Sequence, residues 1–269
     1  MNTLKIAVVS SRSRFCDPAA NLKHFSTLTA RAAKRGARLV CFPELALTSY
    51  TTHPQVLHVA ERIPGPATAA LAKLAAKNRV YISMGMAEQA GGKYYIAQVL
   101  VGPKGYMGKY RKHHPTKGEQ KAGFSPGQDF PVFAVDGFRT GINICADGRE
   151  QDTIQAMRKR KVDLILHPHG NGLSLGRNAE EWTRGKTVYF VPRAVFARAY
   201  VVINNSAGDT ADPDGKQSYG SGALVINPLG QVLKRTAQKT RSEKMILATL
   251  VRPLSELIPA FEMRRLHRT

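Results

Sequence analysis

Three short segments of this 269-residue chain each carry one side chain that could take part in covalent chemistry. C-F-P-E-L contains Glu44, Y-R-K-H-H contains Lys112, and G-I-N-I-C-A-D-G-R contains Cys145. A carboxylate, an ammonium group and a thiol are the groups needed to form and break a thioester on an amide carbon. Together the three segments predict a cysteine amidohydrolase.

Each of the three residues also has a purely structural interpretation. Cys145 could be a small buried apolar residue, since it stands between Ile144 and Ala146. Glu44 could cap the turn that follows it, and Lys112 could be a solvated charge. None of the segments would persuade alone, so it is their joint occurrence that favours the catalytic interpretation.

The elements that must position these residues follow a plan that repeats once along the chain. The first half predicts strand 4–10, a helix at about 19–35, strand 37–43, helix 66–77 and strands 80–87 and 94–101. The second half predicts strand 140–145, helix 150–160, strand 162–168, a helix near 179–198, strand 200–206 and a hairpin over 221–235. Two β-α-β-α-β-β halves with strands too apolar to face water predict an α/β fold. We expect a four-layer α-β-β-α sandwich.

This plan places the reactive residues where sites usually lie. Glu44 directly follows the strand 37–43, and Cys145 is expected to end the strand 140–145. Sites in open α/β sheets gather outside the carboxyl ends of strands. Lys112 follows a hairpin strand in a basic loop that can fold over such a site.

The chain predicts one domain, over residues 1–250, followed by a C-terminal tail, 251–269, that packs on a partner subunit. No Pro/Gly/Ser-rich linker interrupts the sequence. No apolar run approaches the ~18 residues of a membrane span, and the N-terminus reads as a buried strand rather than a signal peptide. The three cysteines, Cys16, Cys41 and Cys145, are odd in number and widely spaced, which favours reduced thiols and a cytoplasmic location.

The formal net charge is +21, from 40 Lys and Arg against 19 Asp and Glu. Such a charge can indicate a nucleic-acid partner or an acidic membrane surface. The basic residues are dispersed, however, and the aromatic residues (7%) are not interleaved with them. A solvated basic surface is therefore the favoured interpretation, and neither a nucleic-acid nor a membrane partner is expected.

Four histidines, His113, His114, His167 and His169, raise the question of a metal site. Their H-H-P and H-P-H settings lack the i,i+4 spacing and the supporting carboxylates that zinc sites favour. No metal site is therefore predicted.

The three reactive segments resemble the nitrilase, or carbon–nitrogen hydrolase, superfamily, and the resemblance extends from I-A-V-V-S to N-P-L-G-Q-V-L. It implies an α-β-β-α sandwich whose members pair through their helical faces. It also implies that Glu44 is the general base, Lys112 the cationic stabiliser and Cys145 the nucleophile. Glu119, in E-Q-K-A-G-F-S-P-G, corresponds to a second glutamate of the family, although its spacing to the following Phe is one residue longer than usual.

Other residues are predicted to contact the substrate. The N–H of Ala146 would bind the oxyanion beside Lys112. His169 and Asn171 lie in a loop after the strand next to the nucleophile, and Tyr50 lies in L-T-S-Y. These polar side chains could equally stabilise their loops. The Ala at 146 stands where the family usually has an aromatic residue, which predicts an altered pocket wall.

The expected function is the hydrolysis of a linear amide or N-carbamoyl compound to an acid and ammonia, through a thioester and without metal or organic cofactor. The partners would be this small molecule and further copies of the chain, in a dimer or larger homo-oligomer. Amide is favoured over nitrile because amidases are the more numerous branch of the resembling family. Two alternatives stay open: nitrile hydrolysis by the same three residues, and a non-catalytic basic scaffold that binds acidic partners or nucleic acid.

Overall fold

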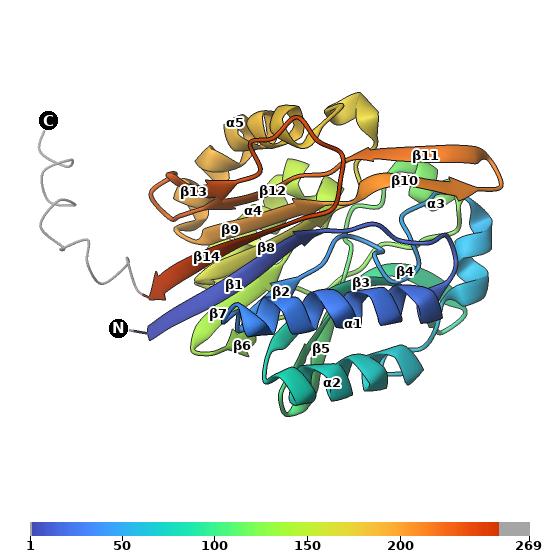
Figure 1. The fold of residues 1–269 in the computed structure, drawn as a ribbon, viewed down its shortest axis with the longest axis horizontal. Helices are drawn as coiled ribbons and strands as arrows, with labels where there is room; N and C mark the ends of the chain where they lie inside the picture. Colours follow the sequence, from blue (N-terminus) through green and yellow to red (C-terminus); the bar gives the residue numbers. More distant parts are fainter. Residues whose placement is uncertain (1, 253–269) are drawn as a thin grey trace, which may run out of the picture.

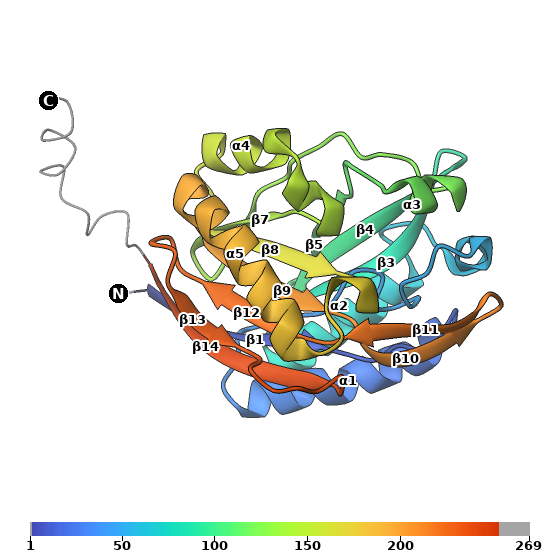
Figure 2. The same cartoon turned by 90° about the horizontal axis from the view of Figure 1, so that it is seen from above.

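Two six-stranded sheets pack face to face, and helices cover their outer faces (Figures 1 and 2). The structure is a computed structural model that describes residues 2–252. In Figure 1 the helices α1 (Pro18–Lys34) and α2 (Pro66–Asn78) lie in the lower half of the view, and α5 (Ala179–Ala197) lies at the top. Figure 2 shows α4 (Gln151–Lys159) next to α5. The predicted four-layer α-β-β-α sandwich is confirmed.

The first sheet combines a parallel centre with antiparallel edges. Its strands, in spatial order, are β14 (Lys244–Arg252), β1 (Asn2–Ser10), β2 (Leu39–Cys41), β3 (Tyr81–Ala90), β4 (Lys93–Gly102) and β5 (Gly105–Arg111). β1, β2 and β3 run parallel, whereas β4, β5 and β14 are antiparallel to their neighbours. The helices α1 and α2 make the crossovers between the parallel strands, as a parallel sheet requires.

The second sheet repeats this plan. Its strands, in spatial order, are β6 (Phe133–Val135), β7 (Phe138–Ile142), β8 (Leu164–His169), β9 (Tyr200–Asn205), β12 (Ala223–Ile226) and β13 (Val232–Arg235). β7, β8 and β9 are parallel, and β12 and β13 continue the sheet in antiparallel pairs. The five strands β1–β5 thus correspond in order and direction to β7, β8, β9, β12 and β13.

Three hydrophobic clusters fill the three interfaces between the four layers. The central cluster lies between the sheets and includes Val8 and Leu39 from one sheet and Leu164 and Val202 from the other. A second cluster joins the first sheet to α1 and α2, and a third joins the second sheet to α5. The central strands β2, β8, β9 and β12 are buried along their whole length, which explains their nearly continuous apolar sequences.

A buried polar contact fixes how the two sheets meet. The amide of Asn204 on β9 donates to the carbonyl oxygens of Val9 on β1 (2.7 Å) and Cys41 on β2 (3.1 Å). Because an unpaired buried amide would be costly, this contact favours one alignment of the sheets. It lies near the carboxyl ends of β2 and β9, and the segment that bears Glu44 begins at the end of β2.

Several details differ from the sequence-based expectation. Cys145 does not end a strand: β7 stops at Ile142, and Cys145 opens a short 3-10 helix, η2 (Cys145–Arg149). A hairpin formed by β10 (Ala207–Asp212) and β11 (Gly215–Gly220) was not predicted, nor were the edge strands β6 and β14. Of the predicted tail, residues 251 and 252 belong to β14, and residues 253–269 lie outside the described part of the chain. The remaining short elements are η1 (Pro54–Val59), α3 (Lys117–Lys121) and η3 (Leu173–Leu175).

Candidate active site

Glu44, Lys112 and Glu119 meet in one buried charge cluster. The ammonium Nζ of Lys112 lies 2.6 Å from Oε1 of Glu44 and 2.7 Å from Oε1 of Glu119. All three side chains are inaccessible to solvent. One ammonium group thus lies between two carboxylates, an arrangement that compensates part of the cost of burying each charge.

Different elements supply the three members of the cluster. Glu44 lies in the turn after β2, and its second oxygen accepts a hydrogen bond of 2.8 Å from the N–H of Gly170, beyond β8. Lys112 follows β5 directly. Glu119 lies in α3, where Thr116 caps the helix: the Thr116 N–H donates to Oε2 of Glu119 (2.7 Å), and the Glu119 N–H donates back to the threonine hydroxyl. The sequence T-K-G-E is a recognisable capping box that predicts this contact.

The turn that carries Glu44 lies directly against β3. The N–H of Leu47 donates to the carbonyl of Gly85 at 2.9 Å. A Cβ atom at position 85 would lie 2.3 Å from the backbone nitrogen of Leu45 and 2.4 Å from the carbonyl oxygen of Pro43. Glycine is therefore required at this point for the Glu44 turn to reach its position.

Charge and burial act on the cluster in opposite directions. Burial raises the pKa of Glu44 to about 7; the Lys112 charge opposes this effect and the Glu119 charge adds to it. For Lys112, burial lowers the pKa, but the negative charges of Glu44 and Glu119 oppose burial, and the pKa stays above its ordinary value. The lysine therefore stays charged near neutral pH, while Glu44 can change between its two protonation states.

Cys145 lies beside this cluster in a strained backbone conformation. Its φ is +45°, in the left-handed region that a residue with a Cβ rarely adopts. Burial raises the pKa of its thiol to about 12; the Glu44 charge raises that pKa further and the Lys112 charge lowers it. The thiol is therefore protonated at neutral pH and needs a base before it can act as a nucleophile.

A chain of amide contacts positions the sulfur. Nδ2 of Asn171 lies 3.3 Å from Sγ of Cys145, and Oδ1 of Asn171 accepts a hydrogen bond from the indole of Trp182 at 3.2 Å. The side chain of Asn205 holds the backbone of Asn171. Its Oδ1 accepts a hydrogen bond from the Asn171 N–H, and its Nδ2 donates one to the Asn171 carbonyl oxygen. Asn171 therefore has a fixed orientation toward the sulfur.

Cys145 opens into a cavity of about 290 Å³. This volume lies near the lower end of the range of small-molecule pockets. α5 supplies much of the wall, and η2 and the loop after β8 supply the rest. The lining residues are Cys145, Ala146, Arg149, His169, Asn171, Leu175, Trp182, Gly185, Lys186, Tyr189 and Phe190.

Asp147 connects two of the three motif segments. Its buried carboxylate accepts hydrogen bonds from the Tyr110 hydroxyl (2.7 Å), the His114 N–H (2.8 Å) and the Ile144 N–H (2.9 Å). The aspartate of C-x-D-x-R thus ties the turn that bears Cys145 to the segment that bears Lys112. Its place in the motif has a structural reason.

Three of the four residues predicted to contact the substrate line the cavity. Ala146, His169 and Asn171 line the cavity. Tyr50 is not among the lining residues; its hydroxyl donates to Oε1 of Glu119 at 2.8 Å and so orients the charge cluster. A substrate contact for Tyr50 stays a prediction.

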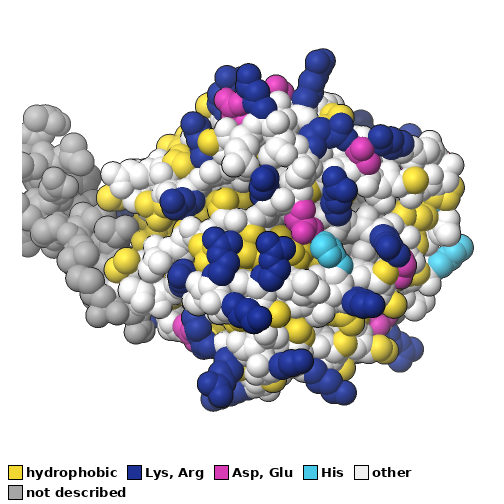
Figure 3. Space-filling view, viewed as in Figure 1, with side chains coloured by type: hydrophobic (Ala, Val, Ile, Leu, Met, Phe, Trp, Pro, Cys, Tyr) yellow, Lys and Arg dark blue, Asp and Glu magenta, His cyan; other side chains and the backbone are white. Residues whose placement is uncertain are grey.

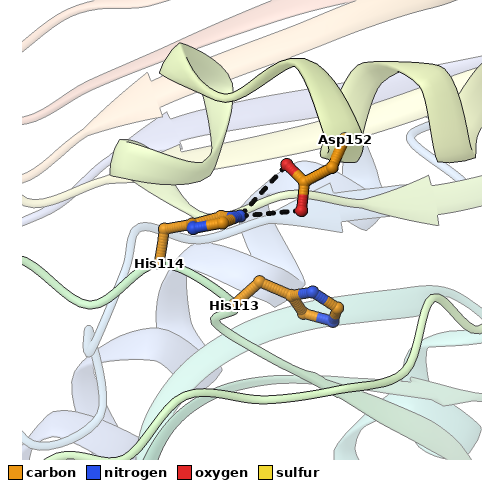
Figure 4. Close-up of side chains that lie close together, drawn as sticks. All are labelled: His113, His114 and Asp152. Carbon is orange, nitrogen blue, oxygen red and sulfur yellow. Dashed lines mark hydrogen bonds and ion pairs between the residues drawn. The ribbon is translucent and has the colours of Figure 1, made fainter.

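Within residues 2–252, one group of three side chains has metal-ligand geometry: His113, His114 and Asp152 (Figure 4). His114 faces the Asp152 carboxylate at 3.0 Å, whereas His113 bonds the carbonyl of Asp129 and stacks on Tyr110. The group lies outside the cavity that Cys145 lines. The rings of His167 and His169 stack on one another, with their centroids 4.8 Å apart.

On the face shown in Figure 3, the basic residues are dispersed, as the sequence indicated. Figure 3 shows Lys and Arg side chains scattered over one face, between uncharged and apolar areas. Of the helices formed by the described residues, none has the length and apolar character needed to span a membrane.

Sequence reasoning missed the contribution of α5 to the cavity. Trp182, Lys186, Tyr189 and Phe190 all line it, yet the helix carries no motif that singles them out. Thr116 could have been found from its capping box. The α5 residues could not, because their role depends on which face of the helix meets the loop after β8.

Comparison with known proteins agrees with this fold. A family model described as carbon–nitrogen hydrolase matches residues 5–259. A nitrilase from Pyrococcus abyssi is 31% identical over 242 residues, which cover 87% of this chain and 86% of that protein. An omega-amidase from Bos taurus is 31% identical over 262 residues, covering 91% and 89%.

The same fold occurs in solved structures. A CN-hydrolase superfamily protein from Xanthomonas campestris, with an arsenic adduct in its active site, superposes with a TM-score of 0.82. The two chains are 20% identical, and the alignment covers 99% of this chain and 97% of that one. Because the family model and the two relatives match most of its length, this chain belongs to the carbon–nitrogen hydrolase, or nitrilase, superfamily.

Proposed function

We propose that this protein hydrolyses a linear amide or N-carbamoyl compound to an acid and ammonia, with Cys145 as nucleophile. The observation that carries the proposal is the buried Glu44–Lys112–Glu119 cluster beside a thiol that opens into a small cavity. A base, a fixed positive charge and a nucleophile are the three groups that thioester chemistry on an amide needs.

The first half of the reaction forms the thioester. Glu44 takes the thiol proton as Sγ of Cys145 attacks the carbonyl carbon, and the oxygen becomes an oxyanion. The Lys112 ammonium and the Ala146 N–H stabilise this oxyanion; one such donor is typically worth about 3 kcal/mol. The carbon–nitrogen bond then breaks, and the nitrogen leaves as ammonia with the proton that Glu44 returns.

The second half releases the acid. Glu44 takes a proton from water, whose oxygen attacks the thioester carbon. The carbon–sulfur bond breaks, and the sulfur regains the proton from Glu44. A carboxyl group with a pKa of about 7 suits this alternation, because it can both accept and donate a proton near neutral pH.

A panel of amides, N-carbamoyl amino acids and nitriles tests the proposal, with ammonia release and the intact mass of the protein as readouts. The expected result is ammonia from amides or carbamoyl compounds and an acyl adduct that maps to Cys145. Cys145→Ala should abolish both, and Cys41→Ala, at a buried free cysteine outside the cavity, serves as the matched control. Neither ammonia nor adduct across the panel would refute the proposal and favour the non-catalytic scaffold.

Nitrile hydrolysis is the second candidate, because one of the two relatives above is named a nitrilase. The same panel separates the two: ammonia from nitriles but not from the matching amides would favour the nitrilase. The cytoplasmic location and the homo-oligomer remain predictions. Size-exclusion chromatography with light scattering measures the oligomeric state directly.

A further inference from the structure

Two histidines and an aspartate converge beside the segment that bears Lys112, outside the cavity that Cys145 lines (Figure 4). His113 and His114 directly follow the lysine, and Asp152 lies in the first turn of α4. One atom from each of the three side chains lies within 4.8 Å of the other two. The sequence gave no sign of this carboxylate, because Asp152 lies 38 residues after His114.

His114 and Asp152 already have the separation of two ligands of one metal ion. Nε2 of His114 lies 3.1 and 3.0 Å from the two carboxylate oxygens of Asp152. With bonds of about 2.0–2.2 Å, two ligand atoms of a tetrahedral zinc ion lie about 3.4 Å apart. No two of the three ligand atoms therefore need to approach by more than about 1.4 Å. The side chains of His114 and Asp152 are 35% and 55% exposed, so they can rotate to close this distance.

His113 offers a nitrogen with a lone pair. Its Nε2 lies 3.0 Å from the carbonyl oxygen of Asp129. A carbonyl oxygen only accepts hydrogen bonds, so in the neutral ring Nε2 carries the proton and Nδ1 carries the lone pair. The ring stacks on Tyr110, with centroids 5.5 Å apart, and contacts Phe130, with centroids 3.9 Å apart. A ligating histidine commonly donates its other ring N–H to a backbone carbonyl in this way.

Backbone contacts orient the other two side chains. The N–H of His114 donates to Oδ1 of Asp147 at 2.8 Å, which fixes the start of the histidine side chain. Oδ1 of Asp152 accepts a hydrogen bond of 2.8 Å from the N–H of Thr153, which leaves Oδ2 as the ligating oxygen. Contacts of this kind, outside the ligands themselves, typically change metal affinity by about 10- to 100-fold.

We propose that His113, His114 and Asp152 bind one divalent transition-metal ion, for which Zn²⁺ is the probe. Imidazole ligands suit zinc, copper and nickel, whereas Mg²⁺ and Ca²⁺ prefer oxygen ligands. The ion would replace the proton that lies between Nε2 of His114 and Asp152, and water would complete its coordination. It would tie the segment that bears Lys112 to α4 and so stabilise the fold. The proposal does not rest on the proposed function, because it concerns binding alone.

Isothermal titration calorimetry with Zn²⁺ tests the site. The protein is the chelator-treated Cys145→Ala variant, which removes the one thiol among the residues that line the cavity. We expect one Zn²⁺ per chain. Asp152→Asn and His113→Phe, each added to this variant, should weaken binding at least 10- to 100-fold, roughly the loss that follows removal of an outer contact alone. His113→Phe keeps a ring against Tyr110 and removes both nitrogens.

Glu243→Gln is the matched control. Glu243 pairs with His24 at 2.7 Å, much as Asp152 pairs with His114, but within residues 2–252 no third ligand accompanies that pair. Its affinity for Zn²⁺ should equal that of the protein without this change. If Glu243→Gln weakens binding as much as Asp152→Asn does, the effect comes from the lost negative charge and the site is refuted.

Thermal unfolding gives a second readout of the same site. With free Zn²⁺ at 100 times its Kd, the Tm should rise by roughly 5–10 °C, because the ion binds the folded chain. Asp152→Asn should remove this rise, and Glu243→Gln should retain it. A Tm that Zn²⁺ leaves unchanged would contradict the proposal.

Three calorimetric results would also overturn the site. The first is the absence of Zn²⁺ binding, and the second is binding that neither Asp152→Asn nor His113→Phe weakens. The third is displacement of Zn²⁺ by an equal concentration of Mg²⁺, which would show a site for hard cations. None of these results bears on amide hydrolysis, so the proposed function would stay in place.

Discussion

Replacing Glu119 by Gln should move the pH dependence of catalysis to lower pH. Glu119 and Glu44 bond to the same ammonium nitrogen, at 2.7 and 2.6 Å, so their carboxylate oxygens lie within about 5 Å of each other. The negative charge of Glu119 raises the pKa of Glu44. Glu119→Gln removes that charge and keeps the size of the side chain.

The size of the effect follows from Coulomb's law. Two unit charges about 5 Å apart interact by about 3 kcal/mol at an effective dielectric constant of 20, which corresponds to about two pH units. The active form of the proposed base is the carboxylate, so kcat/KM of the wild-type protein should rise with pH through about 7. In Glu119→Gln this rise should occur one to two pH units lower.

The assay is ammonia release at low substrate concentration between pH 4.5 and 9, for wild type and variant. Glu88→Gln is the matched control, because Glu88 is equally buried and paired with cations but lies outside the charge cluster. Thermal unfolding of each variant confirms that it is folded over this pH range. A rise in Glu119→Gln that stays near pH 7, or moves to higher pH, contradicts the electrostatic reasoning.

Three further substitutions test how the site is positioned. Asp147→Asn places an amide N–H₂ against N–H and O–H donors that need an acceptor. We expect the free energy of unfolding to fall by about 2 kcal/mol and the Tm, measured by calorimetry, to fall by about 4–8 °C. Gly85→Ala should displace the Glu44 turn, lower the thermal stability and lower kcat at least 10-fold. Gly185→Ala is the control for stability: nothing lies near its Cβ, so its Tm should not fall. Trp182→Phe removes the N–H that orients the asparagine beside the sulfur; kcat should fall roughly 10-fold, and an unchanged kcat would exclude that role.

The sequence was sufficient for the layers of the fold and for the residues of the charge cluster. Apolar strands at regular intervals require burial on both faces, and the repeated order predicted two similar sheets. Glu44 could be placed because it follows a strand that the apolar pattern marks clearly, and Lys112 because it follows a hairpin strand. Glu119 could be placed by its motif, and its capping partner Thr116 by local spacing.

Other features depend on tertiary contacts that no local pattern encodes. The hairpin β10–β11 is polar and only partly buried, so it lacks the apolar signal that marks the core strands. The backbone turn at Cys145, with its positive φ, follows from the packing of η2 rather than from residue preference, since cysteine does not favour this conformation. Arg149 of η2 and Lys186 of α5 line the same cavity, although α4 and β8 separate them in the sequence.

One edge of the first sheet is completed by residues distant in the sequence. β1 pairs with β14 along its whole length, from Asn2 with Arg252 to Ser10 with Lys244. During synthesis, β1 emerges from the ribosome before more than two hundred other residues have been added, and its free edge can meanwhile pair with another nascent chain. The docking of β14 is therefore expected to be a late step of folding, because contacts between residues so distant in the sequence form slowly.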